Sequence, residues 1–216
     1  MRNIQNKILS ILKKTKAIIV DDHIVGTSGR HMDIYINPDN LLPFTHEVSK
    51  LGEIFAEKFK NKKIDVVVGP AIGGIVISQW VAFHLSRLCG KYILGLFTEK
   101  DADKNQVFER GFDKLVKGKN VLVVEDITTT GGSVKKAADT VAKAGGKVVA
   151  VSVIVNRDPK KATSKTIGYK FLPLTVILAS SFTEDECPMC KKNIPVNIEI
   201  AHGKEFMSRK SNNRRN

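Results

Sequence analysis

Two adjacent carboxylates followed by hydroxyl-bearing residues and glycines form the stretch with the clearest chemical meaning. It reads VLVVEDITTTGGS at 121–133, with Glu125 and Asp126 directly after four apolar residues. Glycine lets backbone N–H groups approach an anion closely, and the start of a following helix adds a favourable dipole. Because the turn also carries several hydroxyl donors, residues 128–133 are predicted to bind one phosphate group.

The two acids indicate what else the ligand carries. Carboxylates repel a bare phosphate, but they accept hydrogen bonds from ribose hydroxyls. In the alternative interpretation Glu125 and Asp126 only cap the next helix and favour its dipole. Two acids beside a turn of hydroxyl and glycine residues favour a sugar phosphate instead. The stretch matches neither the GxxxxGK[ST] pattern of a P-loop nor the GxGxxG of a dinucleotide fold.

Alternating apolar runs and amphipathic segments predict the elements that position this turn. Strands are expected at 65–69, 92–97, 120–126, 147–155 and 174–179, and helices at 3–14, 44–59, 75–88 and 133–144. Such alternation predicts an α/β fold with a mostly parallel central sheet flanked by helices. Ligands of these sheets bind at the carboxyl ends of the strands. The polar segment 98–119 is expected to be a mobile loop or an irregular hairpin beside the site.

Composition restricts the class of protein. The 216 residues are 42% hydrophobic and 26% charged, which indicates one globular domain. No apolar run reaches the length of a membrane span, and the N-terminus has no signal-peptide pattern. Three cysteines without a paired framework predict a reducing compartment, and therefore the cytoplasm. The net charge of +13 would attract anions, but without a nucleic-acid-binding module a nucleic-acid partner is not expected.

The stretch 121–133 resembles the phosphoribosyl pyrophosphate (PRPP) signature of type I phosphoribosyltransferases. HIVGTSGRHMDIYIN at 23–37, VGPAIGGIVIS at 68–78 and VNRDP at 155–159 are similar to segments of the orotate phosphoribosyltransferase family. The resemblance implies the type I phosphoribosyltransferase fold over residues 1–206, with a small hood from about 1–40 and the C-terminal part. It also implies a homodimer. Residues 207–216 are expected to form a basic, disordered tail.

Carried over residue by residue, the resemblance implies a complete substrate site. Glu125 and Asp126 would hold the ribose hydroxyls of PRPP, and Mg²⁺ would bridge pyrophosphate and ribose oxygens, with no residue assigned as a protein ligand of a metal. The phosphate contacts would come from Thr128, Thr129, Thr130, Gly131, Gly132 and Ser133, and from the backbone amides of Ala71, Ile72 and Gly73. The orotate contacts would come from Arg157, Thr129, Tyr35 and Ile36.

Arg157 also fits this role from its chemistry, because a guanidinium binds a carboxylate through two parallel hydrogen bonds. The alternative is an ordinary surface arginine at a strand end. The loop FTEKDADKNQVFERGF at 97–112 differs from the Arg-Lys-x-x-Lys-x-His-Gly loop of many family members, since it has no histidine. Thr27 also stands where many members carry a lysine. The catalytic cations that neutralise the leaving pyrophosphate are expected among Lys100, Lys104 and Arg110.

Cys187 and Cys190 form a CxxC motif that supplies two of the four ligands of a structural zinc site. Cys89, His202 or a second subunit would have to complete it, and the alternative is a tight turn with two inert thiols. His23, His31, His46 and His84 show no ligand spacing and are expected to be structural or exposed.

Two other functions stay open from the sequence. One is a phosphoribosyltransferase for another base, such as a purine, in which only the base pocket differs. The other is a regulator without catalysis that senses a nucleotide and binds RNA, which the altered loop and the high positive charge allow.

Overall fold

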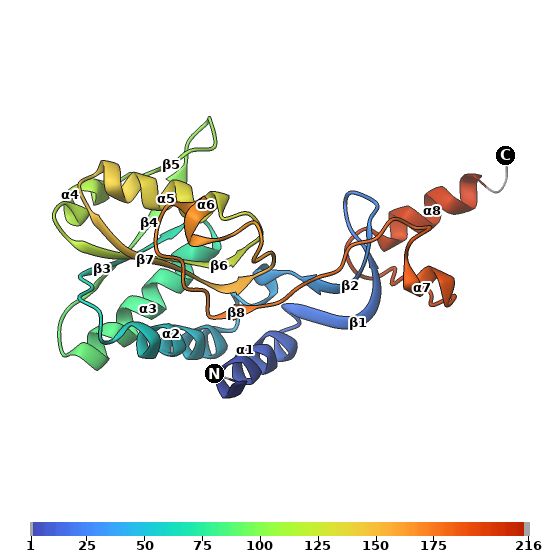
Figure 1. Ribbon diagram of the computed structural model, residues 1–216, viewed down its shortest axis with the longest axis horizontal. Coiled ribbons are helices and arrows are strands. Elements are labelled where there is room, and N and C mark those ends of the chain that lie inside the picture. The colour runs from blue at the N-terminus through green and yellow to red at the C-terminus, as the bar shows by residue number, and fades with distance from the viewer. Residues whose placement is uncertain (1, 214–216) are drawn as a thin grey trace.

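The computed structural model describes residues 2–213 and has a six-stranded sheet at its centre (Figure 1). The strand order is β5-β4-β3-β6-β7-β8, and only β5 runs antiparallel to its neighbour. The bounds are β3 Val66–Pro70, β4 Leu94–Lys100, β5 Gln106–Val107, β6 Asn120–Thr128, β7 Lys147–Asn156 and β8 Thr175–Val176. The mostly parallel sheet confirms the predicted fold class.

Both faces of the sheet are buried, which explains why its central strands are continuous apolar runs. On one face Val67, Leu122 and Val124 pack against α1 (Arg2–Lys14), α2 (Thr45–Phe59) and α3 (Gly73–Cys89). On the other face Val68 and Val123 pack against α5 (Gly132–Lys143). Helices therefore cover both faces, and the loops at the carboxyl ends of the strands are left to bind ligands.

A second, two-stranded sheet lies at one end of the molecule, away from the central sheet (Figure 1). Its strands are β1 (Ile18–Val25) and β2 (His31–Ile36). The C-terminal segment, with α7 (Pro188–Lys191) and α8 (Gly203–Asn213), lies beside this hairpin. His31 and Phe182 exchange two backbone hydrogen bonds of 2.8 Å, which join the two segments. This unit, residues 18–36 with 181–213, is called the hood below.

The segment 98–119 is a short hairpin followed by a helix. β4 continues to Lys100, β5 pairs with it, and α4 follows at Phe112–Val116. The buried Thr98 hydroxyl donates to Gln106 Oε1 at 2.6 Å, which fixes the base of the hairpin. Of the two predicted forms, the structure has the hairpin; α4 was not predicted because its five residues are too few to show a helical period.

Helix α8 differs from the predicted disordered tail. It extends through residues 207–213, and only residues 214–216 of that tail lie outside the described part of the chain. Lys210 forms an ion pair with Glu184, and the Phe206 ring packs edge-on against His31 with centroids 5.0 Å apart. These contacts with the rest of the hood stabilise α8, whose basic composition alone would not favour a helix.

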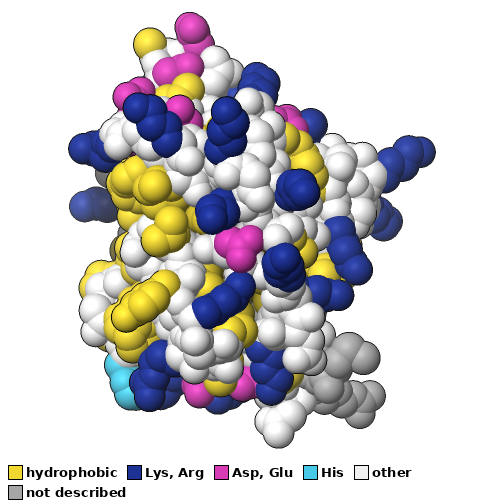
Figure 2. Space-filling model, turned by 90° about the vertical axis from the view of Figure 1, so that its left-hand side faces the viewer, with side chains coloured by type: hydrophobic (Ala, Val, Ile, Leu, Met, Phe, Trp, Pro, Cys, Tyr) yellow, Lys and Arg dark blue, Asp and Glu magenta, His cyan; other side chains and the backbone are white. Residues whose placement is uncertain are grey.

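The positive charge is dispersed on the face of the molecule that Figure 2 shows. On the face shown in Figure 2, Lys and Arg side chains are scattered among uncharged ones and do not form a continuous stripe. Among the described residues, no helix combines the length and apolar character that crossing a membrane requires.

Candidate active site

The predicted acids lie at the carboxyl end of β6, in the middle of the central sheet. Asp126 is buried, with 9% of its surface exposed, and Glu125 is partly buried. Asp126 Oδ1 accepts a hydrogen bond of 2.5 Å from its neighbour's amide, that of Ile127. Glu125 Oε2 is buried and has no hydrogen-bond partner within the described chain. A buried carboxylate oxygen without a partner is costly, so it indicates a place where a ligand donates.

The electrostatics of this pair are unusual for carboxylates. Burial, together with the charge of Asp126, raises the pKa of Glu125 to about 8, and the nearby positive charge of Lys100 opposes the rise. Burial also raises the pKa of Asp126 to about 6, against the hydrogen bond from Ile127. Perturbed carboxylates of this kind at a strand end are characteristic of functional sites.

The turn after β6 has the form of an anion site. Gly131 has a φ of 83°, a left-handed conformation that favours glycine, and its amide donates to Thr128 Oγ1 at 2.9 Å. Thr129, Thr130 and Ser133 are exposed, and Gly132 begins α5. The turn therefore presents hydroxyls at a helix N-terminus, as predicted from the sequence.

The loop after β3 lies directly against the acids. A Cβ on Gly73 would lie 1.8 Å from Asp126 Oδ2, so any larger residue at this position would displace the carboxylate. The Ala71–Ile72 peptide bond is cis. The Ala71 amide donates to the Thr98 carbonyl at 2.8 Å, so it is already engaged, whereas the prediction gave it to the pyrophosphate. Ile72 and Gly73, at the start of α3, keep the predicted role as a proposal.

Arg157 follows β7, the strand beside β6, and its amide donates to the Thr128 carbonyl at 2.8 Å. Its Nε atom is buried and has no hydrogen-bond partner within the described residues. The sheet thus brings Arg157 beside the phosphate turn. A buried guanidinium nitrogen without an acceptor is suited to an anionic ligand.

The β1–β2 hairpin of the hood carries Tyr35 and Ile36, the two residues predicted to line the base pocket. Tyr35 is half-buried, whereas the Ile36 side chain is 7% exposed and belongs to the main core. The role of both as lining of a base pocket stays a prediction. The charge of Asp39, just after β2, contributes to the raised pKa of Asp126, so this part of the chain lies near the acids. Sequence reasoning missed Asp33 of β2, whose buried Oδ1 also has no partner in the described chain.

The three predicted loop cations occupy different places. Lys100 ends β4, and its charge acts on Glu125. Lys104 lies in the turn between β4 and β5, and its carbonyl accepts a hydrogen bond of 2.9 Å from Lys136. Arg110 is paired with Glu99 at 2.9 Å. The structure therefore brings only Lys100 of these three into electrostatic contact with the acids.

Comparison with known proteins gives a consistent result. Residues 39–186 match the family described as "Phosphoribosyl transferase domain". An orotate phosphoribosyltransferase from Caldanaerobacter subterraneus subsp. tengcongensis is 36% identical over 192 residues, covering 89% of this chain and 95% of that protein. One from Desulforamulus reducens is 35% identical over 191 residues, covering 88% and 94%.

A solved structure has the same fold. The Mycobacterium tuberculosis H37Rv orotate phosphoribosyltransferase in complex with Fe(III) dicitrate superimposes with a TM-score of 0.63 and 23% identity. The match covers 79% of this chain and 97% of that one.

Proposed function

Because this chain belongs to the phosphoribosyl transferase family, we propose that it is an orotate phosphoribosyltransferase. The reaction transfers ribose 5-phosphate from PRPP to orotate and gives orotidine 5′-monophosphate and pyrophosphate. The observation that carries the site assignment is the pair of partnerless buried atoms, Glu125 Oε2 and Arg157 Nε, at the same edge of the sheet. Glu125 Oε2 accepts hydrogen bonds and Arg157 Nε donates them. The first suits the ribose hydroxyls of one substrate, and the second suits the carboxylate of the other.

The chain's residues mainly position and stabilise charge. In the transfer, the bond from ribose C1 to pyrophosphate breaks and a bond from C1 to a ring nitrogen of the base forms. The sugar gains positive charge in the transition state, and the leaving group gains negative charge. Glu125 and Asp126 would hold the ribose hydroxyls and stabilise the sugar's charge, while the turn 128–133 would fix the 5-phosphate.

The oxygen donors of the site fit Mg²⁺, the ion expected with PRPP. Mg²⁺ prefers oxygen ligands and keeps several of its waters. Glu125 and Asp126 would hold the ion through water or through the ribose hydroxyls. Glu125 could do so with its Oε2 atom, which has no hydrogen-bond partner in the described chain. The bound ion would neutralise charge on the pyrophosphate.

The activity is tested with purified protein, PRPP and Mg²⁺, supplying orotate, uracil, adenine, hypoxanthine and guanine separately. Nucleotide and pyrophosphate formation with orotate is expected. Turnover with a purine alone would keep the phosphate site and contradict the orotate pocket. No turnover with any base, together with salt-sensitive RNA binding, would favour the regulator.

The raised pKa of Glu125 predicts pH-dependent PRPP binding. Ribose hydroxyls donate best to the ionised carboxylate, so binding should release the proton that Glu125 carries below its pKa of about 8. The Kd for PRPP is then expected to fall by about tenfold between pH 7 and pH 9, in a range above the pKa of about 6 of a phosphate monoester. Calorimetric titration with PRPP in the absence of a nucleobase measures this Kd. The Glu125→Gln variant should bind PRPP more weakly, and its Kd should change less with pH.

The same group predicts an opposite trend in the stability of the free protein. Between its ordinary pKa of 4.5 and about 8, folded Glu125 holds a proton that the unfolded chain releases. The free energy of unfolding should therefore fall as pH rises through this window, by up to about 1.4 kcal/mol per pH unit. Glu125→Gln should accordingly raise the Tm at pH 8. For the binding prediction, a Kd for PRPP that changes equally with pH in the wild type and in Glu125→Gln would contradict the role of Glu125.

Lys100 is expected to be the loop cation that matters most. Replacing it with alanine should lower kcat by about tenfold or more, since it removes a positive charge beside the acids and the leaving group. Lys100→Arg should restore most of the rate, and Lys114→Ala on the exposed face of α4 serves as the control. A larger loss of kcat in Lys104→Ala or Arg110→Ala than in Lys100→Ala would contradict this order.

Features away from the site support two further parts of the proposal, a homodimer and a cytoplasmic setting. Large apolar side chains are exposed at the end of α3 and just after it, including Phe83, Leu88 and the almost fully exposed Tyr92, and a partner subunit would bury them. The three cysteines are free thiols, as suits a reducing compartment.

A further inference from the structure

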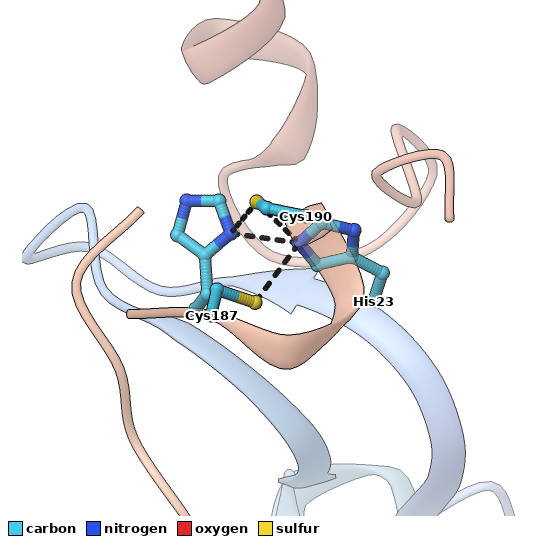
Figure 3. Close-up of side chains that lie close together, drawn as sticks. His23, Cys187 and Cys190 are labelled. Atoms are coloured by element: carbon cyan, nitrogen blue, oxygen red, sulfur yellow. Dashed lines mark hydrogen bonds between the residues drawn. The ribbon is translucent and has the colours of Figure 1, made fainter. Parts of the chain in front are cut away.

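Four metal-binding side chains converge in the hood, away from the proposed active site. They are His23 of β1, His31 of β2, Cys187 and Cys190, and their ligand atoms all lie within 4.8 Å of one another. Figure 3 shows His23, Cys187 and Cys190 directed toward one another from β1 and α7. We propose that these four residues bind one structural Zn²⁺ that joins the β1–β2 hairpin to the C-terminal segment. This inference is independent of the proposed activity.

Two of the distances between the ligand atoms match those of a tetrahedral zinc site. With Zn–S bonds of about 2.3 Å and Zn–N bonds of about 2.0–2.1 Å, a sulfur and a nitrogen in a tetrahedron lie about 3.6 Å apart. The Sγ atoms of Cys187 and Cys190 lie 3.7 and 3.6 Å from His23 Nε2, and Cys190 Sγ lies 3.4 Å from His31 Nδ1. The 3.4 Å between Cys190 Sγ and His31 Nδ1 and the 2.7 Å between the two imidazole nitrogens are shorter than the tetrahedral separations, so binding an ion requires the two imidazole rings to move apart.

The remaining nitrogen of His23 has the partner expected of a ligand. Its Nδ1 lies 2.7 Å from the Ile194 carbonyl and can only donate to it, so Nε2 directs its lone pair at the cluster, where it lies 2.7 Å from His31 Nδ1. Histidine ligands of metals commonly donate their second N–H to a carbonyl in this way. The ligand set of two thiolates and two imidazoles in a tetrahedral arrangement favours zinc over harder cations such as Mg²⁺.

The hood also needs a cross-link of this kind. Several of its buried apolar side chains, such as Ile24, Val25 and Met189, belong to neither of the two large cores, whereas Ile18 and Ile36 at the base of the hairpin belong to the main one. Small units with little core are commonly stabilised by a metal or a disulfide. His23, His31 and Cys187 are almost fully buried, so the cluster occupies the position that a hydrophobic core would fill. A pocket of about 430 Å³ opens beside His23 and Cys190 and gives an ion a route to the cluster.

These ligands correct the sequence-based expectation. Cys89 lies at the end of α3, where its thiol contacts the Lys60 carbonyl, and the nearest acid to His202 Nδ1 is Glu205 at 3.9 Å. Neither belongs to the cluster. His23 and His31, which were expected to be structural or exposed, complete the group instead, because the β1–β2 hairpin lies against the CxxC turn.

The first experiment measures the metal in protein purified without chelators and then dialysed against a weak chelator. About one zinc ion per chain is expected. Cys187→Ser, Cys190→Ser and His23→Ala should each lose most of the zinc, whereas Cys89→Ser, the matched thiol outside the cluster, should keep it. The proposal would be overturned if the wild-type protein held less than about a tenth of the expected zinc, or if all variants held as much zinc as the wild type.

A second measurement avoids variants that fail to fold. Wild-type protein stripped of metal and loaded with Co²⁺ should show sulfur-to-cobalt charge-transfer absorption and the intense visible bands of tetrahedral cobalt. Weak visible bands typical of octahedral cobalt would overturn the site. So would a Cys187–Cys190 disulfide in protein purified under reducing conditions, detected as the loss of two titratable thiols after unfolding in the presence of a strong chelator, since oxidised sulfurs cannot bind zinc as thiolates.

Discussion

Replacing Arg157 with alanine is expected to lower kcat/KM for orotate by about 30- to 5,000-fold, the equivalent of about 2–5 kcal/mol. Its Nε atom is buried and has no hydrogen-bond partner in the described chain, so a bound carboxylate would be its main acceptor. Truncation would leave that carboxylate without its paired donors. Because the phosphate turn is built from other residues, the Kd for PRPP measured without orotate should change by less than about threefold.

The controls for Arg157 separate geometry from charge. Arg157→Lys keeps the charge but loses the planar pair of donors, so its rate should lie between those of wild type and alanine. Arg209→Ala, an exposed arginine on α8, should have wild-type kinetics. An Arg157→Ala enzyme with unchanged kcat/KM for orotate, or one that loses PRPP binding equally, would contradict its role at the base.

Replacing Asp126 with asparagine is expected to lower kcat/KM for PRPP by about a hundredfold. The change removes a negative charge that would hold the ribose and oppose the positive charge of the transition state. It also places an amide beside the Ile127 amide, which at present donates to Asp126 Oδ1. Steady-state kinetics with PRPP varied at saturating orotate measures the effect, and Asp113→Asn on the exposed face of α4 is the matched control.

Gly73→Ala provides a second route to the same residue. Its Cβ would lie 1.8 Å from Asp126 Oδ2, so the carboxylate must move. The losses from Gly73→Ala and Asp126→Asn should therefore be smaller in combination than their sum, because both act on one group. Fully additive losses, or an Asp126→Asn enzyme within threefold of wild type, would contradict the role of this carboxylate.

The central sheet could be predicted because its strands are buried on both faces. Runs such as 120–126 and 147–155 are mostly apolar, and the helices between the strands are amphipathic. The pattern that identifies each strand or helix therefore lies within one short stretch of sequence. The phosphate turn and the two acids are also contiguous in sequence. The strand at 174–179 was predicted longer than the two-residue β8, because Ile177 and Leu178 are as apolar as strand residues. The Ile177 amide still donates to the Asn156 carbonyl of β7 at 3.0 Å, although β8 ends at Val176.

The proposed zinc site could not be predicted from spacing. His23 and His31 are separated from Cys187 and Cys190 by 159–167 residues in the three contacts that join them. Their approach depends on backbone pairing between β2 and Phe182, which no local pattern in the sequence indicates. The engaged Ala71 amide, and Asp33 Oδ1 with no hydrogen-bond partner in the described chain, likewise result from tertiary contacts.

The most direct test of the central claim is a crystal structure of the protein with PRPP, Mg²⁺ and a non-reacting analogue of orotate. The account predicts the 5-phosphate in the turn 128–133, the ribose hydroxyls on Glu125 and Asp126, and the carboxylate of the analogue on Arg157. A phosphate bound outside that turn, or an analogue whose carboxylate lies away from Arg157, would contradict the assignment of one substrate site at the ends of β6 and β7.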